Sequence, residues 1–132
     1  MRIVVTGGTG FIGRPLCTSL CQEGHQVTLL TRRIETQWPC GSTITAVEWN
    51  GREAGAWEKC LDGADAVINL AGAPIADGRW NDAQKQLLMD SRVFTTRLLV
   101  EALSHCSSKP RTLINASGIG YYGASDDRVL YE

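Results

Sequence analysis

Hydrophobic and polar positions along the chain predict strands and helices in alternation. Short apolar runs bounded by glycine, proline or polar clusters predict buried strands, and apolar residues at helical spacing predict the helices between them. The predicted strands are Ile3 to Val5, Gln26 to Leu30, Thr43 to Trp49, Ala66 to Leu70 and Arg111 to Ala116. The predicted helices are Arg14 to Glu23, Glu53 to Leu61, and a long helix from Asn81 or Asp82 to about Cys106.

Two of these helices carry a stripe that should face the sheet. In the first we expect Leu16, Leu20 and one cysteine to face it. In the long helix the expected stripe is Leu88, Ser91, Thr95, Leu98 and Ala102. Residues Ile34 to Ser42 contain Pro39 and Gly41 and predict a loop. Strands that alternate with helices throughout predict the α/β class, with a doubly wound parallel sheet.

A glycine-rich stretch joins the first strand to the first helix, which is the context that a dinucleotide-binding fingerprint requires. Gly7 and Gly8 should allow a tight turn with positive φ, because glycine has no Cβ. Gly10 should let a pyrophosphate approach the backbone, and Gly13 should let the helix pack closely on the strand. We therefore predict a cofactor turn; a glycine turn without a ligand is the alternative.

The helix that follows this turn should take part in phosphate binding. Its N-terminus offers unpaired N–H groups and the positive end of the helix dipole, and we expect Phe11 and Ile12 to lie beside the cofactor. A P-loop is excluded, because Gly13 is followed by Arg14 and Pro15 and not by Lys and Ser or Thr.

The end of the second strand indicates which dinucleotide binds. In a doubly wound sheet, ligands bind at the C-terminal ends of the strands. Where NAD enzymes carry a carboxylate for the adenosine ribose, this chain has Thr31, Arg32 and Arg33. A guanidinium binds a 2′-phosphate in bidentate fashion, so NADP(H) is predicted over NAD(H). Two solvated arginines on a turn are the alternative.

The other strand ends supply further candidate contacts. After the third strand, the amide of Asn50 is placed to meet the adenine edge. After the fourth, the small residues of the Leu70, Ala71 and Gly72 segment leave room for the nicotinamide ribose. After the fifth, Ser117 has the hydroxyl best placed to reach a substrate.

Four more residues are candidates for the substrate side. Tyr121 or Tyr122 would act as a phenolic acid or base if a neighbouring cation lowered its pKa, with packing of the loop as the alternative. Trp80 would close over the nicotinamide or substrate, with Arg79 as an anion contact. The alternative for Trp80 is a hydrophobic staple at the start of the long helix.

Composition narrows the class of protein and its partners. The 132 residues allow one domain at most, and 43% hydrophobic with 20% charged residues is typical of a globular chain. A net charge of −1 gives no reason to expect nucleic acid or an anionic membrane, and no apolar run is long enough to cross a bilayer. We expect a small-molecule substrate, and we keep a homo-oligomer as an option.

The cysteines favour a reducing, cytoplasmic setting. There are five, an odd number at irregular spacing. Cys17 and Cys21 are four residues apart on the first helix, as a pair of metal ligands would be. No second pair accompanies them, so we expect buried thiols and no metal.

Three segments together resemble the extended short-chain dehydrogenase/reductase superfamily, and within it the NAD(P)-dependent epimerase/dehydratase group. They are Thr6 to Gly13, the Asn69-Leu70-Ala71-Gly72 run and Ser117 to Gly123. The residues Gly78-Arg79-Trp80, Lys85 and Ser91-Arg92 resemble a subgroup of sugar-nucleotide epimerase or cell-division-inhibitor-like proteins. The resemblance implies that residues 1–132 are a Rossmann-type NAD(P)-binding domain, incomplete at its C-terminus. It would be the N-terminal portion of a longer protein with a small substrate domain.

The resemblance also implies a reaction. In the family a hydride moves to or from nicotinamide C4, the Tyr of a Tyr-x-x-x-Lys pair moves a proton, and a Ser or Thr holds the substrate oxygen. That Ser or Thr position, five residues before Gly123, is Gly118 here, and Ser117 is one residue earlier. The Tyr-x-x-x-Lys pair would lie beyond Glu132.

We therefore expect an NADP-dependent oxidoreductase or epimerase-like protein that acts on a small polar or nucleotide-sugar substrate. A non-catalytic NAD(P)-binding sensor or regulator is the alternative, and a structural interaction module that uses open sheet edges is a third.

Overall fold

A parallel five-stranded sheet forms the centre of the computed structural model, which describes residues 1–34, 44–75 and 79–117. The strands are β1 (Arg2–Thr6), β2 (Gln26–Thr31), β3 (Ile44–Glu48), β4 (Ala66–Asn69) and β5 (Thr112–Asn115). Their order is β3-β2-β1-β4-β5, and every neighbouring pair is parallel. The chain therefore winds outward in both directions from β1, which confirms the doubly wound sheet.

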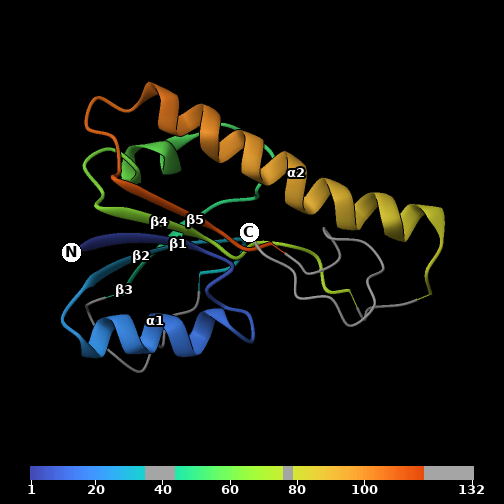
Figure 1. Cartoon of the computed structure of the whole chain (residues 1–132), viewed down its shortest axis with the longest axis horizontal. Helices are drawn as coiled ribbons and strands as arrows, with labels where there is room; N and C mark the ends of the chain where they lie inside the picture. Colours follow the sequence, from blue (N-terminus) through green and yellow to red (C-terminus); the bar gives the residue numbers. More distant parts are fainter. Residues whose placement is uncertain (35–43, 76–78, 118–132) are drawn as a thin grey trace, which may run out of the picture.

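Helices cover both faces of this sheet. They are α1 (Gly13–Gln22), the 3₁₀ helix η2 (Ala56–Cys60) and α2 (Asp82–His105). Figure 1 shows α1 on one face and α2 on the other, with the first turns of α2 extending beyond the strands. The helix that we predicted from Glu53 to Leu61 is thus shortened to η2.

Each face has its own core, because side chains along a strand point alternately to opposite faces. The core under α1 contains Ile3, Val5, Cys17, Cys21, Val27, Leu29, Ile44, Ala66 and Ile68. The core under α2 and η2 contains Val4, Leu30, Trp49, Trp57, Leu61, Ala64, Val67, Leu99 and Ala102. Burial on both faces explains why the inner strands β1, β2 and β4 are, taken together, apolar at most positions, whereas β5 at the edge is exposed along its length.

Two predicted helix stripes need correction. On α1 both Cys17 and Cys21 are buried, where we expected one cysteine, and Leu16 and Leu20 are half-buried and pack against the same core as expected. On α2 the buried positions are Thr95, Leu99 and Ala102, and Leu98 is only partly buried. The other predicted positions, Leu88 and Ser91, are half-buried as well, so the expected stripe lies on the more buried side of α2, and Leu99 is the buried position that it missed.

Asn81, one of the two predicted cap residues, caps the start of α2. Asn81 has extended backbone angles, and its Oδ1 accepts a hydrogen bond from the Gln84 N–H at 2.8 Å. Asn81 and not Asp82 is therefore the N-cap residue, because its side-chain oxygen accepts a hydrogen bond from an N–H group of the first turn.

Some expectations fall outside the described residues: the loop after Ile34, and both Tyr121 and Tyr122. Within the part of the chain that the structure describes, no helix has the length and apolarity needed to cross a membrane.

Candidate dinucleotide-binding site

The turn after β1 is shaped by the lack of side chains at Gly7 and Gly13. Gly7 has φ +67°, and a Cβ there would lie 2.6 Å from the Leu70 carbonyl carbon. A Cβ on Gly13 would overlap the Gly7 oxygen and lie 2.5 Å from the Gly8 Cα. Gly13 therefore lets α1 begin against the turn itself, and not against the strand as we expected.

Gly8 and Gly10 have different structural roles, because Gly8 is buried and Gly10 is exposed. Gly8 is buried and does not share the predicted positive φ; a Cβ there would overlap Leu29 and lie 2.9 Å from the Cys17 sulfur. Gly8 therefore permits close packing of α1 on β2. Gly10 is exposed, and among the described atoms a Cβ there would meet just the Gly7 oxygen, at 3.2 Å. The space above Gly10 is thus open to a ligand.

The N-terminus of α1 opens onto that space. Ile12 is the N-cap residue, and no side chain in the described part of the molecule caps the helix or places a carboxylate in its first turn. Phe11 is 97% exposed and Ile12 is 66% exposed. In this first turn the Arg14 N–H donates to the Gly10 carbonyl at 3.0 Å and Pro15 has no N–H, so the described helix start offers the Gly13 N–H and the positive end of the helix dipole to an anion such as a pyrophosphate.

The end of β2 holds its two arginines on an ordered turn. Thr31 is buried, and its Oγ1 donates to the Arg33 carbonyl at 3.0 Å and accepts from the Arg33 N–H at 3.3 Å. Arg32 and Arg33 are both exposed, and neither guanidinium has a partner among the described residues. Two cations thus stand at the sheet edge where an adenosine ribose would lie.

Asn50 is arranged differently from the expectation of a free amide. Its Oδ1 accepts hydrogen bonds from the N–H groups of Arg52 at 2.8 Å and Glu53 at 3.2 Å. This oxygen therefore holds the turn after β3, and an adenine edge would have to meet the Nδ2 group. The neighbouring Trp49 N–H bonds the Thr31 carbonyl at 2.8 Å, which ties this turn to the end of β2.

A polar network that the sequence analysis missed joins the ends of β1, β4 and β5. Thr6 Oγ1 donates to Asn69 Oδ1 at 2.5 Å, and Asn69 Nδ2 donates to Asn115 Oδ1 at 2.6 Å and to Thr96 Oγ1 at 3.2 Å. Thr6 and Asn69 are almost fully buried. The available signal was a polar residue at the last position of three strands, which becomes informative only once the register pairs them.

This network fixes the segment after β4. The Ala71 N–H donates to Thr6 Oγ1 at 3.2 Å and to Asn69 Oδ1 at 3.3 Å, and the Leu70 N–H donates to the Thr6 carbonyl at 3.2 Å. Because Gly7 lies directly against the Leu70 backbone, the glycine turn and the β4 segment form one continuous edge.

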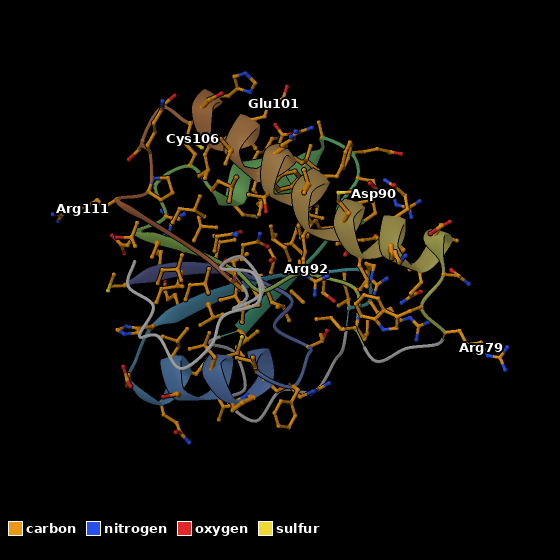
Figure 2. All side chains as sticks on the ribbon, turned by 45° about the vertical axis from the view of Figure 1, so that its right-hand side comes forward. Arg79, Asp90, Arg92, Glu101, Cys106 and Arg111 are labelled. Carbon is orange, nitrogen blue, oxygen red and sulfur yellow. The ribbon has the colours of Figure 1, made fainter. Side chains whose placement is uncertain are left out.

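The substrate-side candidates are not all brought to this edge. Ser117 is exposed just after β5, and the Ala116 N–H bonds the Asn69 carbonyl at 2.9 Å, so this strand end lies beside β4. Arg79 precedes α2 and points away from the body of the molecule (Figure 2). Trp80 is 63% exposed, and the position where a staple partner would lie is Lys85, which disfavours a staple.

Comparison with known proteins identifies the family of this chain. The sequence profile of the NAD dependent epimerase/dehydratase family matches residues 3–131. The chain belongs to this family. The family is NAD(P)-dependent, and the parallel sheet with its glycine turn is the Rossmann-type arrangement that such proteins share.

Two curated relatives show how much of such a protein this chain represents. It is 40% identical to the epimerase family protein YfhF of Bacillus subtilis, covering 100% of this chain and 42% of YfhF. It is 38% identical to the epimerase family protein Mb2239 of Mycobacterium bovis, covering 98% of this chain and 40% of that protein. The chain thus spans about two fifths of the length of these relatives.

Two solved structures are similar in fold and sequence. Human epimerase family protein SDR39U1, in a complex with NADPH, has a TM-score of 0.73 and 33% identity over 95% of this chain and 39% of its own. A UDP-glucuronic acid 4-epimerase from Bacillus cereus, in a complex with NAD, has a TM-score of 0.79 and 25% identity over 98% of this chain and 44% of its own.

Proposed function

We propose that the chain is the NADP(H)-binding part of an oxidoreductase or epimerase-like protein that acts on a small polar or nucleotide-sugar substrate. The observation that carries the choice of NADP(H) is the exposed Arg32 and Arg33 pair at the end of β2, where a carboxylate would repel a 2′-phosphate. The NADPH complex of SDR39U1 supports the same choice, whereas the similar structure of the Bacillus cereus epimerase holds NAD.

The described residues fit such a cofactor. The open side of Gly10 and the uncapped start of α1 would hold the pyrophosphate, and the arginines would hold the 2′-phosphate. The Leu70 to Gly72 segment would border the nicotinamide ribose. The bound cofactor would supply the hydride, and the chain's own part is to orient it along the sheet edge.

Ser117 is the chain's candidate for holding a substrate oxygen. It is exposed at the end of β5 and would donate or accept one hydrogen bond there. We further propose that residues 1–132 are one incomplete NAD(P)-binding domain, and that the proton-transferring Tyr and Lys and most substrate contacts belong to a part of the protein beyond it.

The substitution Arg32→Asp tests the cofactor assignment. It removes a charged hydrogen bond and adds a repulsion, so NADPH binding should weaken by about 1.5–3 kcal/mol while NADH binding is retained. The matched control is Arg97→Asp, the same charge change at an exposed position of α2. Titration of both cofactors by calorimetry gives the result. An equal loss in the two arginine variants would reject the assignment.

A non-catalytic dinucleotide sensor is the second candidate, favoured by the position of Ser117 one residue before the expected Ser or Thr. The two functions differ in turnover. If the protein that carries this chain oxidises NADPH with a sugar nucleotide or small carbonyl, it is an enzyme; if it binds NADPH and no such substrate is turned over, the sensor is favoured.

A further inference from the structure

Arg92 holds the segment after β4 from the side of α2. Its Nη2 donates to the Ala73 carbonyl at 3.2 Å, and its Nη1 donates to the Leu88 carbonyl, one turn earlier in α2, at 3.2 Å. Figure 2 shows Arg92 below α2, on the side of the helix that faces the strand ends. One planar guanidinium therefore bridges the helix backbone and the backbone of the segment after β4.

Gly72 is the residue that this guanidinium covers. A Cβ on Gly72 would lie 3.1 Å from Arg92 Cζ, 3.2 Å from Nη2 and 3.4 Å from Nε. The two shorter contacts are tighter than ordinary van der Waals distances, so a side chain at position 72 would push the guanidinium aside by a few tenths of an ångström. Gly72 and Arg92 are thus matched to each other in shape.

Ser91 adds a second attachment at the same place. Its Oγ accepts a hydrogen bond from the Ala73 N–H at 2.9 Å and donates to the Leu88 carbonyl at 3.0 Å. The N–H and the C=O of Ala73 are therefore both bound by side chains of α2. Neither contact is needed for the sheet, whose pairing ends at Asn69.

We propose that Ser91 and Arg92 are positioning residues for the nicotinamide half of the cofactor. They hold Gly72 and Ala73, in the segment whose Leu70 backbone contacts Gly7, where the nicotinamide ribose would lie. The inference rests on the proposed function, and it assigns no contact with the adenosine half. We call the Ser91 and Arg92 contacts to Ala73 the clamp. Removing one of these contacts should lower the affinity for NADPH and leave the affinity for ligands that lack the nicotinamide riboside unchanged.

The test compares NADPH with adenosine 2′,5′-bisphosphate, which carries the adenine, the 2′-phosphate and one 5′-phosphate alone. Arg92→Lys keeps the charge but cannot bridge two carbonyls with a planar fork. NADPH affinity should fall about tenfold, as expected for loss of a charge-assisted hydrogen bond, and bisphosphate affinity should not change. Arg97→Lys on the same helix is the matched control and should change neither.

Two further variants separate the clamp from its charge and from general stability. Arg92→Gln should weaken NADPH as much as Arg92→Lys does. If Arg92→Gln lowers the affinity for both ligands and Arg92→Lys lowers the affinity for neither, only the charge of Arg92 matters. That result would overturn the inference. Ser91→Ala, which removes one acceptor and keeps Arg92, should repeat the selective loss if the arginine variants fold poorly.

The Gly72→Ala substitution tests the shape match. Alone, Gly72→Ala should lower the affinity for NADPH, because its methyl group pushes the guanidinium aside. Combined with Arg92→Lys, it should lower that affinity little further. Full additivity, or equal weakening of both ligands, would overturn the clamp. Failure of the unmodified chain to bind the bisphosphate and NADPH would instead reject the proposed function and this inference with it.

Discussion

The glycine turn after β1 and the segment after β4 lie against each other, yet they are held in different ways. The turn keeps its shape because Gly7 and Gly13 lack side chains whose atoms would overlap backbone. The β4 segment keeps its shape because Thr6, Asn69 and Arg92 bind its backbone groups. A shape that depends on missing atoms tolerates no substitution, whereas a shape that depends on hydrogen bonds weakens stepwise as they are removed.

The largest effect should follow from adding a methyl group to the turn. Gly13→Ala places a Cβ against the backbone of Gly7 and Gly8, which cannot move as a flexible side chain would. We expect a loss of about 3 kcal/mol in the free energy of unfolding, typical of severe overpacking, measured by urea denaturation. An unchanged urea midpoint would show that the turn has more freedom than its geometry indicates.

The matched substitution at Gly10 should separate binding from stability. A Cβ at position 10 would press on the Gly7 oxygen, at 3.2 Å, and meet no other described atom, so Gly10→Val should lower the free energy of unfolding by about 1 kcal/mol, less than Gly13→Ala does. Its branched side chain would fill the volume assigned to the pyrophosphate, and cofactor binding should be lost. If circular dichroism is retained and NADPH still binds with the same affinity, the phosphate lies elsewhere.

The hydrogen-bonded segment should respond more mildly. Asn69→Leu removes the acceptor of the buried Thr6 hydroxyl, at a cost of about 1–3 kcal/mol for a buried polar group left without it, whereas Thr96 and the exposed Asn115 keep the hydrogen bond between them. Thr6→Val, which removes one hydroxyl and keeps its shape, should cost less. The comparison fails if Asn69→Leu is as stable as the parent in urea.

The smallest effect concerns two thiols that pack against the core under α2. Burial raises the pKa of the Cys60 thiol, against the opposing charge of Arg2; burial and then the Asp62 charge raise the pKa of Cys106. A raised pKa in the folded state stabilises the fold below the pKa of the unfolded thiol, and this contribution is lost as pH rises through the raised value.

Alkylation measures this shift directly. At mildly alkaline pH both thiols should react with iodoacetamide more slowly in the folded chain than in urea, because less thiolate is present. Peptide mass spectrometry would assign each site. Equal rates in the folded and unfolded chain would mean that this face is more open than the structure has it.

The same contrast explains what could be predicted from the sequence. The sheet and the turn follow from apolar runs and glycine spacing, which are local signals, and the structure has them at nearly the expected residues. The Thr6–Asn69–Asn115 network and the Arg92 contact join residues far apart in the chain, so no local pattern reports them. Leu99 replaced Leu98 as a core residue because a small rotation of a long helix changes which side is buried.

The two arginines after β2 were only partly predictable from the sequence. Their position at a strand end was predictable, and the structure adds that Thr31 orders their turn. What they bind depends on a ligand and not on a contact within the chain. The central claim is therefore a claim about charge recognition at one sheet edge.

Titration of the unmodified chain with NADPH and with NADH, side by side in one buffer, tests that claim most directly. The two ligands differ only in the 2′-phosphate, so the ratio of their dissociation constants isolates the contribution of that phosphate, which we assign to Arg32 and Arg33. We predict that NADPH binds at least about tenfold more tightly, as charge-assisted hydrogen bonds imply. Equal affinities, or tighter binding of NADH, would contradict the account.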